Sequence, residues 1–287
     1  MATGPGYPAT GLVLLSLDDG SRRASASIGT DPVAVILAPD GTMAYLADSS
    51  PGDVYAVRVP ALTVAWKQHV GGAPFGLLID AVRLYVSLFS NASVVELDPK
   101  TGILIGMHSV PEGPAVMSLA PDGRVLVAAT SGKVTYLDGP SLPAGQGYGI
   151  AVIAGEIWTA DYKRAELVRA RDDHRVPLPL KVFPFWLAPG SSGTLLVAAE
   201  GAEEDSDPGA VFSFDPTTEA FTSLALPRDP DQVVQSGSKV LVASHGDRNV
   251  LAIEGGATKI WAQGGEAVAI APDAPLNLLV VAVNAHE

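Results

Sequence analysis

Short apolar runs and polar turns alternate along the whole chain, and the same order of them keeps returning. Residues 32–47 hold an apolar run, the turn Pro39-Asp40-Gly41 and a second apolar run, and residues 114–129 repeat this order around Pro121-Asp122-Gly123. Apolar runs of about four to eight residues, bounded by Pro, Asp and Gly, are typical of buried β-strands. The pattern therefore predicts pairs of buried strands joined by tight turns.

Five further segments align with these two, so that one unit is repeated seven times. The units are anchored at residues 32, 74, 114, 147, 184, 230 and 266, which lie 33 to 46 residues apart. In several units a third, alternating run ends in Asp, and a turn such as Asp98-Pro99-Lys100-Thr101-Gly102 leads into a fourth run. A four-stranded repeat of this length matches one blade of a β-propeller. We therefore expect an all-β, seven-bladed propeller of four-stranded antiparallel blades.

The last unit is incomplete, because the chain ends after only two of its strands. Two strand-like runs, Leu12–Leu17 and Ala24–Ile28, precede the first anchor, and we expect them to complete this blade and close the ring. Closure removes two open sheet edges. The chain is then a single domain, 1–287, with blades at about 29–70, 71–110, 111–145, 146–182, 183–226, 227–263 and 264–287 plus 11–28. The third blade has little material for a fourth strand between Gly139 and Gly145.

The strand and turn residues also resemble a known repeat. Ala44-Tyr45-Leu46-Ala47 and Leu84-Tyr85-Val86-Ser87, together with the Pro-Asp-Gly turns, are similar to the YVTN-type β-propeller repeat. The resemblance implies a seven-bladed, WD40-like ring of the surface-layer-like or lactonase-like kind. It also implies a bacterial protein that is often exported to the periplasm or beyond. It implies little about activity, since related propellers include ligand binders, lactonases and lyases.

Composition narrows the classes of partner. The 31 acidic and 18 basic residues give a formal net charge of −13, which repels nucleic acids and anionic membranes. The absence of cysteine excludes disulfides, thiolate catalysis and cysteine-based zinc sites. No apolar run approaches the length of a membrane span. We expect a monomer without a nucleic-acid partner, and the compartment stays open because a chain without cysteine fits either the cytosol or an exported bacterial protein.

Candidate ligand residues follow from the repeat. Propeller ligands usually bind where the first strand of each blade begins and the second ends, which we call the top face. Acidic and aromatic side chains gather at these positions, and Asp229 and Asp231 stand before the first strand of blade 6. The candidates for ligand binding are Asp48, Glu112, Tyr148, Asp161, Phe185, Trp186 and Glu266. The alternative is that the carboxylates only solvate loop ends and that the aromatic side chains belong to the core.

A metal site is the sharpest subset of this face. Glu200, His245, Asn284 and Asp48 come from blades 5, 6, 7 and 1, which are neighbours in a closed ring. Carboxylate, imidazole and amide oxygen together suit a divalent cation, and the oxygens favour calcium or magnesium. The alternative for His245 is a solvated loop residue. No cofactor is required by any motif, because the chain has no G-x-S-x-G, H-E-x-x-H or P-loop.

Three functions remain open from the sequence, and the third of them is an outer-envelope protein that only packs with copies of itself. The first is a non-catalytic scaffold that binds a protein or a small molecule through its acidic top face. The second is a calcium- or magnesium-dependent hydrolase or lyase, lactonase-like, with its site at the channel mouth. The sequence does not decide whether the protein is an enzyme.

Overall fold

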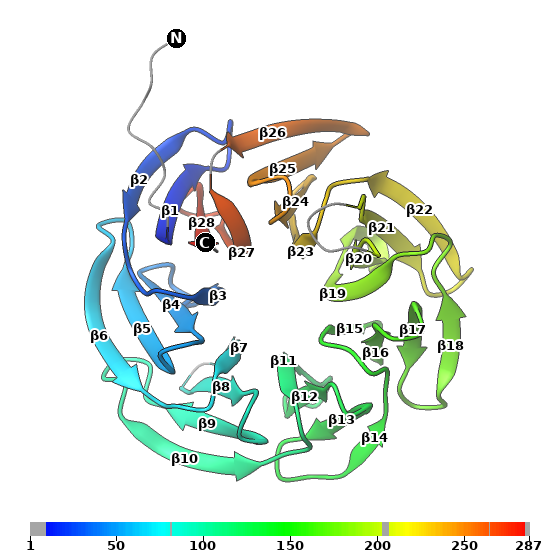
Figure 1. Cartoon of the computed structure of the whole chain (residues 1–287), viewed down its shortest axis with the longest axis horizontal. Helices are drawn as coiled ribbons and strands as arrows, with labels where there is room; N and C mark the ends of the chain where they lie inside the picture. The colour runs from blue at the N-terminus through cyan, green and yellow to red at the C-terminus, as the bar shows by residue number, and fades with distance from the viewer. Residues whose placement is uncertain (1–9, 81, 203–206, 264, 285–287) are drawn as a thin grey trace.

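Seven four-stranded antiparallel sheets stand around a common axis, with one strand of each nearest the axis (Figure 1). The computed structural model describes residues 10–80, 82–202, 207–263 and 265–284. The innermost strand of every sheet contacts the innermost strand of the next, and the last contacts the first, so the ring is closed. The predicted seven-bladed propeller is confirmed.

The first four blades follow one another along the chain, and the strands of each succeed one another from the axis outward. Blade 1 comprises β3 (Pro32–Leu37), β4 (Met43–Asp48), β5 (Asp53–Arg58) and β6 (Thr63–His69). Blade 2 comprises β7 (Pro74–Ile79), β8 (Leu84–Leu88), β9 (Ser93–Leu97) and β10 (Leu104–Ser109). Blade 3 comprises β11 (Pro114–Leu119), β12 (Val125–Ala129), β13 (Lys133–Tyr136) and β14 (Ser141–Pro143). Blade 4 comprises β15 (Ile150–Ile153), β16 (Glu156–Asp161), β17 (Glu166–Arg169) and β18 (His174–Pro177).

The remaining three blades complete the ring. Blade 5 comprises β19 (Phe183–Pro189), β20 (Leu195–Glu200), β21 (Ala210–Asp215) and β22 (Ala220–Ala225). Blade 6 comprises β23 (Pro230–Ser236), β24 (Lys239–Ser244), β25 (Asn249–Glu254) and β26 (Ala257–Gln263). Blade 7 comprises β27 (Glu266–Asp273), β28 (Leu278–Asn284), β1 (Gly11–Ser16) and β2 (Arg22–Ala26). The helical content of the described residues is one 3-10 turn, η1 (Ser191–Gly193), and no helix among them is long and apolar enough to span a membrane.

The N-terminal strands close the last blade, as the sequence predicts. Strand β1 pairs with β28 from Gly11–Val283 to Ser16–Leu278, and β2 lies outside β1. All six residues of β1 are buried. The strand is therefore part of the core and not a loose extension.

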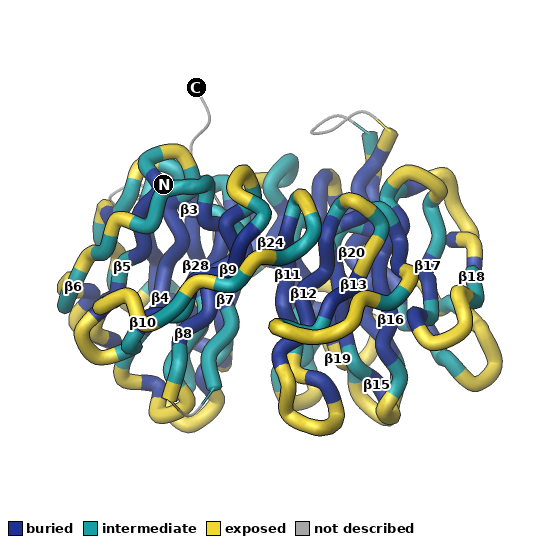
Figure 2. The backbone as a smooth tube through the Cα atoms, turned by 90° about the horizontal axis from the view of Figure 1, so that it is seen from below, coloured by how far each residue is buried: buried dark blue, intermediate teal, exposed yellow. Residues whose placement is uncertain are grey.

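The core lies between neighbouring blades. The second strands, such as β8 and β12, are buried along their whole length, whereas the outer strands β6 and β10 are half exposed. Figure 2 shows the buried segments in the middle of the disc and exposed turns along both of its faces. Blade 3 does form its fourth strand, but β14 has only three residues.

Candidate functional site

The first strand of six blades is irregular where it begins at the top face. One extra residue follows the anchor. In blade 1, Pro32 pairs with Asp48 and Ala34 pairs with Ala47, so Val33 has no pairing residue on β4. Such a bulge turns a side chain out of the regular alternation. The same irregularity occurs in blades 2, 3, 5, 6 and 7, and the residues it displaces include Phe75, Ala115, Phe185, Asp231 and Val268.

Five of the six displaced side chains share one cavity at the channel mouth. Val33, Phe75, Phe185, Asp231 and Val268 all line a cavity of ≈ 170 Å³. Its other lining residues are Pro32, Trp186, His245 and Asn284. We call this cavity the mouth. The repeated bulge thus directs one side chain from each of these five blades into the mouth.

One side of the mouth is a histidine among carboxylates. Nδ1 of His245 lies 3.4 Å from Oδ2 of Asp229 and 3.8 Å from Oδ2 of Asp231, and its Nε2 lies 3.3 Å from Oε2 of Glu266. The backbone N–H of His245 donates to the carbonyl of Asp229 at 2.9 Å, which ties the two loops of blade 6 together. Arg248 lies 3.3 Å from the other oxygen of Glu266. This side of the mouth can hold a cation.

The other side of the mouth is aromatic. The ring of Tyr148 is centred 4.8 Å from that of Phe185, 5.6 Å from that of Phe75 and 6.2 Å from that of Phe89. Tyr148 belongs to blade 4 and Phe75 to blade 2, so the cluster passes over blade 3. The space for it exists because blade 3 places the small Ala115 at the displaced position, where it is fully buried.

Four of the seven candidate ligand residues lie at the mouth or beside it. Phe185 and Trp186 line the mouth, Tyr148 packs on Phe185, and Glu266 contacts His245. Glu112 is exposed and does not line the mouth.

Asp48 and Asp161 are both paired with groups of their own blades, and their role in ligand binding stays a prediction. The buried carboxylate of Asp48 accepts the backbone N–H groups of Thr30 and Asp31. Burial raises the pKa of Asp48 above its usual value, and these two hydrogen bonds act against that rise. Asp161 is also fully buried, and its Oδ2 lies 3.1 Å from Arg164 and 2.8 Å from Arg175.

The four predicted metal ligands are engaged with different partners. Glu200 accepts a hydrogen bond from the hydroxyl of Tyr162 at 2.7 Å, and the side-chain amide of Asn284 donates to Asp31 at 2.8 Å. Among the described residues, one group of His and carboxylate side chains brings its ligating atoms within 4.8 Å of one another: Asp229, Asp231 and His245. Only His245 belongs to both sets, and the four-residue set stays a prediction.

The sequence alignment did not point to Phe75, and it placed Asp231 at the top face without including it among the ligand candidates. Each stands one residue after its anchor, as does Phe185, and this position differs in chemistry from blade to blade. The bulge that aims this position into the mouth leaves no mark in the pattern of apolar residues.

Comparison with known proteins shows the fold alone. No protein-family model and no curated protein matches the chain. A putative 6-phosphogluconolactonase from Bacteroides fragilis is similar in structure, with a TM-score of 0.69 at 14% identity over 93% of this chain and 99% of that one. The periplasmic gluconolactonase of Pseudomonas aeruginosa gives a TM-score of 0.65 at 15% identity over 96% and 99%. The propeller domain of Cps50 (Swd1) from Myceliophteria thermophila gives a TM-score of 0.66 at 13% identity, over 89% of this chain and 97% of that one.

These similar structures include lactonases as well as a propeller domain of another kind. At such low identity they support the seven-bladed architecture and no activity. The resemblance to the YVTN-type repeat stays a prediction.

Proposed function

We propose that this protein is a non-catalytic binding propeller whose mouth takes a cationic group, presented by a small molecule or by a protein. One observation supports this most: the mouth has Asp231 and His245 on one side and Phe75 and Phe185 on the other. A carboxylate attracts a cation by its charge, and an aromatic face adds about 0.5–2 kcal/mol. An ammonium or guanidinium group between the two sides would use both.

The size of the mouth limits the ligand. Pockets for drug-sized molecules typically measure about 300–1,000 Å³. At ≈ 170 Å³ the mouth has room for a single side chain or a small head group. The ligand is therefore a cationic end group, and the rest of the molecule lies outside the mouth, on the top face.

Charge also selects against the opposite class of ligand. Asp229, Asp231 and Glu266 surround His245, and the chain as a whole carries a formal charge of −13. A phosphorylated or nucleic-acid ligand would be repelled over a long range as well as at the site.

Titration calorimetry tests this proposal with ligands that differ only in charge. We expect butylammonium and arginine to bind, their neutral counterparts butanol and citrulline to bind at least about tenfold more weakly, and added salt to weaken binding. The variant Phe185→Leu should lose most of the affinity. Phe221→Leu, on the outer strand of the same blade, is the matched control and should bind as the wild type does. Equal binding of butylammonium and butanol would contradict the proposal.

A metal-dependent activity is the second candidate, and the grouping of Asp229, Asp231 and His245 favours it. Three ligands of this kind would leave coordination positions open, and a bound calcium or magnesium ion could then polarise a carbonyl for lactone hydrolysis or lyase chemistry. We expect either ion to raise the melting temperature in this case and His245→Ala to abolish the effect. No shift with either ion, and no lactone hydrolysis in their presence, would remove this candidate.

We further propose that the protein works as a monomer outside the cytoplasm. The YVTN-like repeat and the periplasmic gluconolactonase among the similar structures support the location. Cell fractionation and light scattering of the purified protein test the two statements.

A further inference from the structure

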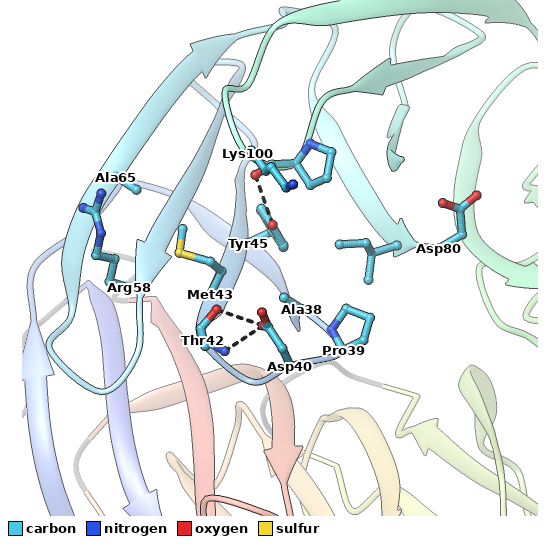
Figure 3. A pocket seen from close by; sticks show the side chains of 12 residues that line it. Ala38, Pro39, Asp40, Thr42, Met43, Tyr45, Arg58, Ala65, Asp80 and Lys100 are labelled. Carbon is cyan, nitrogen blue, oxygen red and sulfur yellow. Dashed lines mark hydrogen bonds between the residues drawn. The ribbon is translucent and has the colours of Figure 1, made fainter. Parts of the chain in front are cut away.

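A second, larger cavity lies at the other face of the ring, between blades 1 and 2. It measures ≈ 610 Å³, within the range of pockets that hold small molecules. Its walls come from turns at the far ends of the strands: β3–β4, which holds Asp40, β7–β8, which begins at Asp80, and β9–β10, which holds Lys100 (Figure 3). We call it the inter-blade cavity. It shares no lining residue with the mouth.

The wall between the two blades is fixed by hydrogen bonds. The hydroxyl of Tyr45 and the indole N–H of Trp66, both in blade 1, donate to the carbonyl of Pro99 in blade 2, each at 3.1 Å. Gly102 sits against the indole so closely that an added Cβ would lie 2.7 Å from Cε3 of Trp66. Burial and the charges of Asp40 and Asp98 raise the pKa of Tyr45 to about 12, so its hydroxyl remains a donor. The cavity is therefore formed before any ligand arrives.

Four charged side chains line the cavity, and none of them neutralises another. Among the ion pairs of the described residues, none includes Arg58 or Lys100. Asp40 accepts the N–H of Thr42 at 3.0 Å and its hydroxyl at 2.8 Å. These neutral donors hold its carboxylate in the turn.

The second carboxylate is held in the same way. Asp80 accepts the backbone N–H groups of Val82 and Arg83 and the hydroxyl of Tyr85. Figure 3 places Arg58 and Asp80 on opposite sides of the cavity, with Met43 and Tyr45 between them. Fixed charges of both signs therefore stand apart around apolar walls, which include Pro39, Met43 and Ile79.

We propose that the inter-blade cavity binds a zwitterionic organic molecule with an apolar body, of the size of an apolar dipeptide. Its anionic end would lie toward Arg58 and Lys100, its cationic end toward Asp40 and Asp80, and its body against Met43 and Ile79. A ligand with a single charge would satisfy only one side. A zwitterion also escapes the repulsion that the net charge of −13 exerts on anions. The proposal does not depend on the function proposed for the mouth.

Three forms of one dipeptide test this proposal, because they share their apolar body and differ in the group at one end, which is charged or neutral. The probes are leucyl-phenylalanine, its N-acetyl derivative, which lacks the cation, and its C-terminal amide, which lacks the anion. Titration calorimetry should show that the free dipeptide binds tightest and that removing either charge weakens binding about three- to tenfold. Equal binding of all three, or no binding of the free dipeptide, would overturn the proposal.

Variants separate the two cavities. Arg58→Met and Lys100→Met keep an apolar stem and remove one cation each. They should weaken the binding of the free dipeptide and of its N-acetyl form and leave the binding of the amide unchanged. Lys133→Met, on blade 3, is the control for loss of a surface cation and should bind as the wild type does. Asp231→Asn alters the mouth alone and should also leave the dipeptide unaffected. If Asp231→Asn abolished dipeptide binding and Arg58→Met did not, the ligand would belong to the mouth and the inter-blade proposal would be wrong.

Discussion

Acidic side chains stand at the top face in blades 1 and 4, and also in blade 6. Their partners in blades 1 and 4 differ from those in blade 6. Asp48 and Asp161, the last residues of β4 and β16, are fully buried and held by backbone N–H groups or by arginines. At the same place in blade 6, β24 ends in Ser244, whose hydroxyl donates to the carbonyl of Arg228 at 2.6 Å. The carboxylates of blade 6, Asp229 and Asp231, stand on the preceding segment beside His245.

This difference teaches that a place in the repeat does not decide what a carboxylate does. Where side chains of its own blade pair with it, as Arg164 and Arg175 do with Asp161, the carboxylate contributes to the stability of the blade. Where its neighbours are other carboxylates and a histidine, as around Asp231, the group adds negative charge to the mouth. Variants of single residues in the two sets can break or sharpen this contrast between structural and ligand-binding carboxylates.

The largest effect is expected at Asp161. Asp161→Asn removes the charge that faces Arg164 and Arg175, and breaking a buried pair costs about 3–5 kcal/mol. Both arginines are partly exposed and Arg175 keeps Glu166, so we expect a loss of about 2–3 kcal/mol in the free energy of unfolding. Urea unfolding measures it, and butylammonium binding at the mouth should not change. A loss of binding without a loss of stability would reverse the assignment.

The next effect is expected at Asp231, and it is of the opposite kind. Asp231→Asn keeps the shape of the side chain and removes one negative charge from the mouth, so butylammonium should bind about tenfold more weakly, which corresponds to about 1.4 kcal/mol. The free energy of unfolding should stay the same or rise slightly, because repulsion with Asp229 and Glu266 is reduced. Titration calorimetry and urea unfolding of the same preparation give both values. Unchanged binding would show that Asp231 is not part of the site.

The sequence predicted the ring well because the repeat is written in apolar residues. The pairs of buried strands, the turns between them and the closure of blade 7 by Leu12–Leu17 all depend on hydrophobic periodicity, which is a strong signal. The shortness of the fourth strand of blade 3 could also be predicted, because Gly139 and Gly145 leave few residues between them for a strand.

The mouth was harder to predict, because a shift of one residue moves a side chain to another side of a strand. The alignment set His245 beside Asp48, whereas the pairing of Pro230 with Ser244 and of Pro32 with Asp48 makes Ser244 the equivalent residue. His245 thus lies one position further on. The bulges that displace Phe75 and Asp231 add a second shift of this kind, and no single-sequence pattern marks them.

A smaller effect is expected at Asp48, although it is as deeply buried as Asp161. Its partners are neutral N–H groups, and its Oδ1 accepts from both Thr30 and Asp31. The variant Asp48→Asn keeps an oxygen that can accept these hydrogen bonds, and it removes the negative charge. Burial of that charge and its proximity to Asp31 raise the pKa of Asp48. We therefore expect a change in unfolding free energy of about 1 kcal/mol or less at neutral pH. A loss equal to that of Asp161→Asn would show that charge is not what separates the two residues.

The smallest effect extends the contrast to the histidines, because His108 is held by carboxylates as His245 is, but between the outer parts of blades 2 and 3. Its Nε2 lies 3.0 Å from Glu96, which also pairs with Arg83, and its Nδ1 lies 2.6 Å from Asp138. Burial alone would lower the pKa of His108, but the hydrogen bonds and charges of Asp138 and Glu96 outweigh it and raise the pKa.

A histidine pKa that is raised in the folded state stabilises the protein fully below the unfolded pKa, near 6.5, and this contribution is lost as the pH rises through the folded value. His108→Gln should therefore cost about 0.5 kcal/mol or less at pH 5.5 and still less at pH 9, when urea unfolding of variant and wild type is compared at both values. Butylammonium binding at the mouth should be the same for both proteins at each pH. A cost that grew with pH would mean that neutral His108, and not its protonated form, links the two blades.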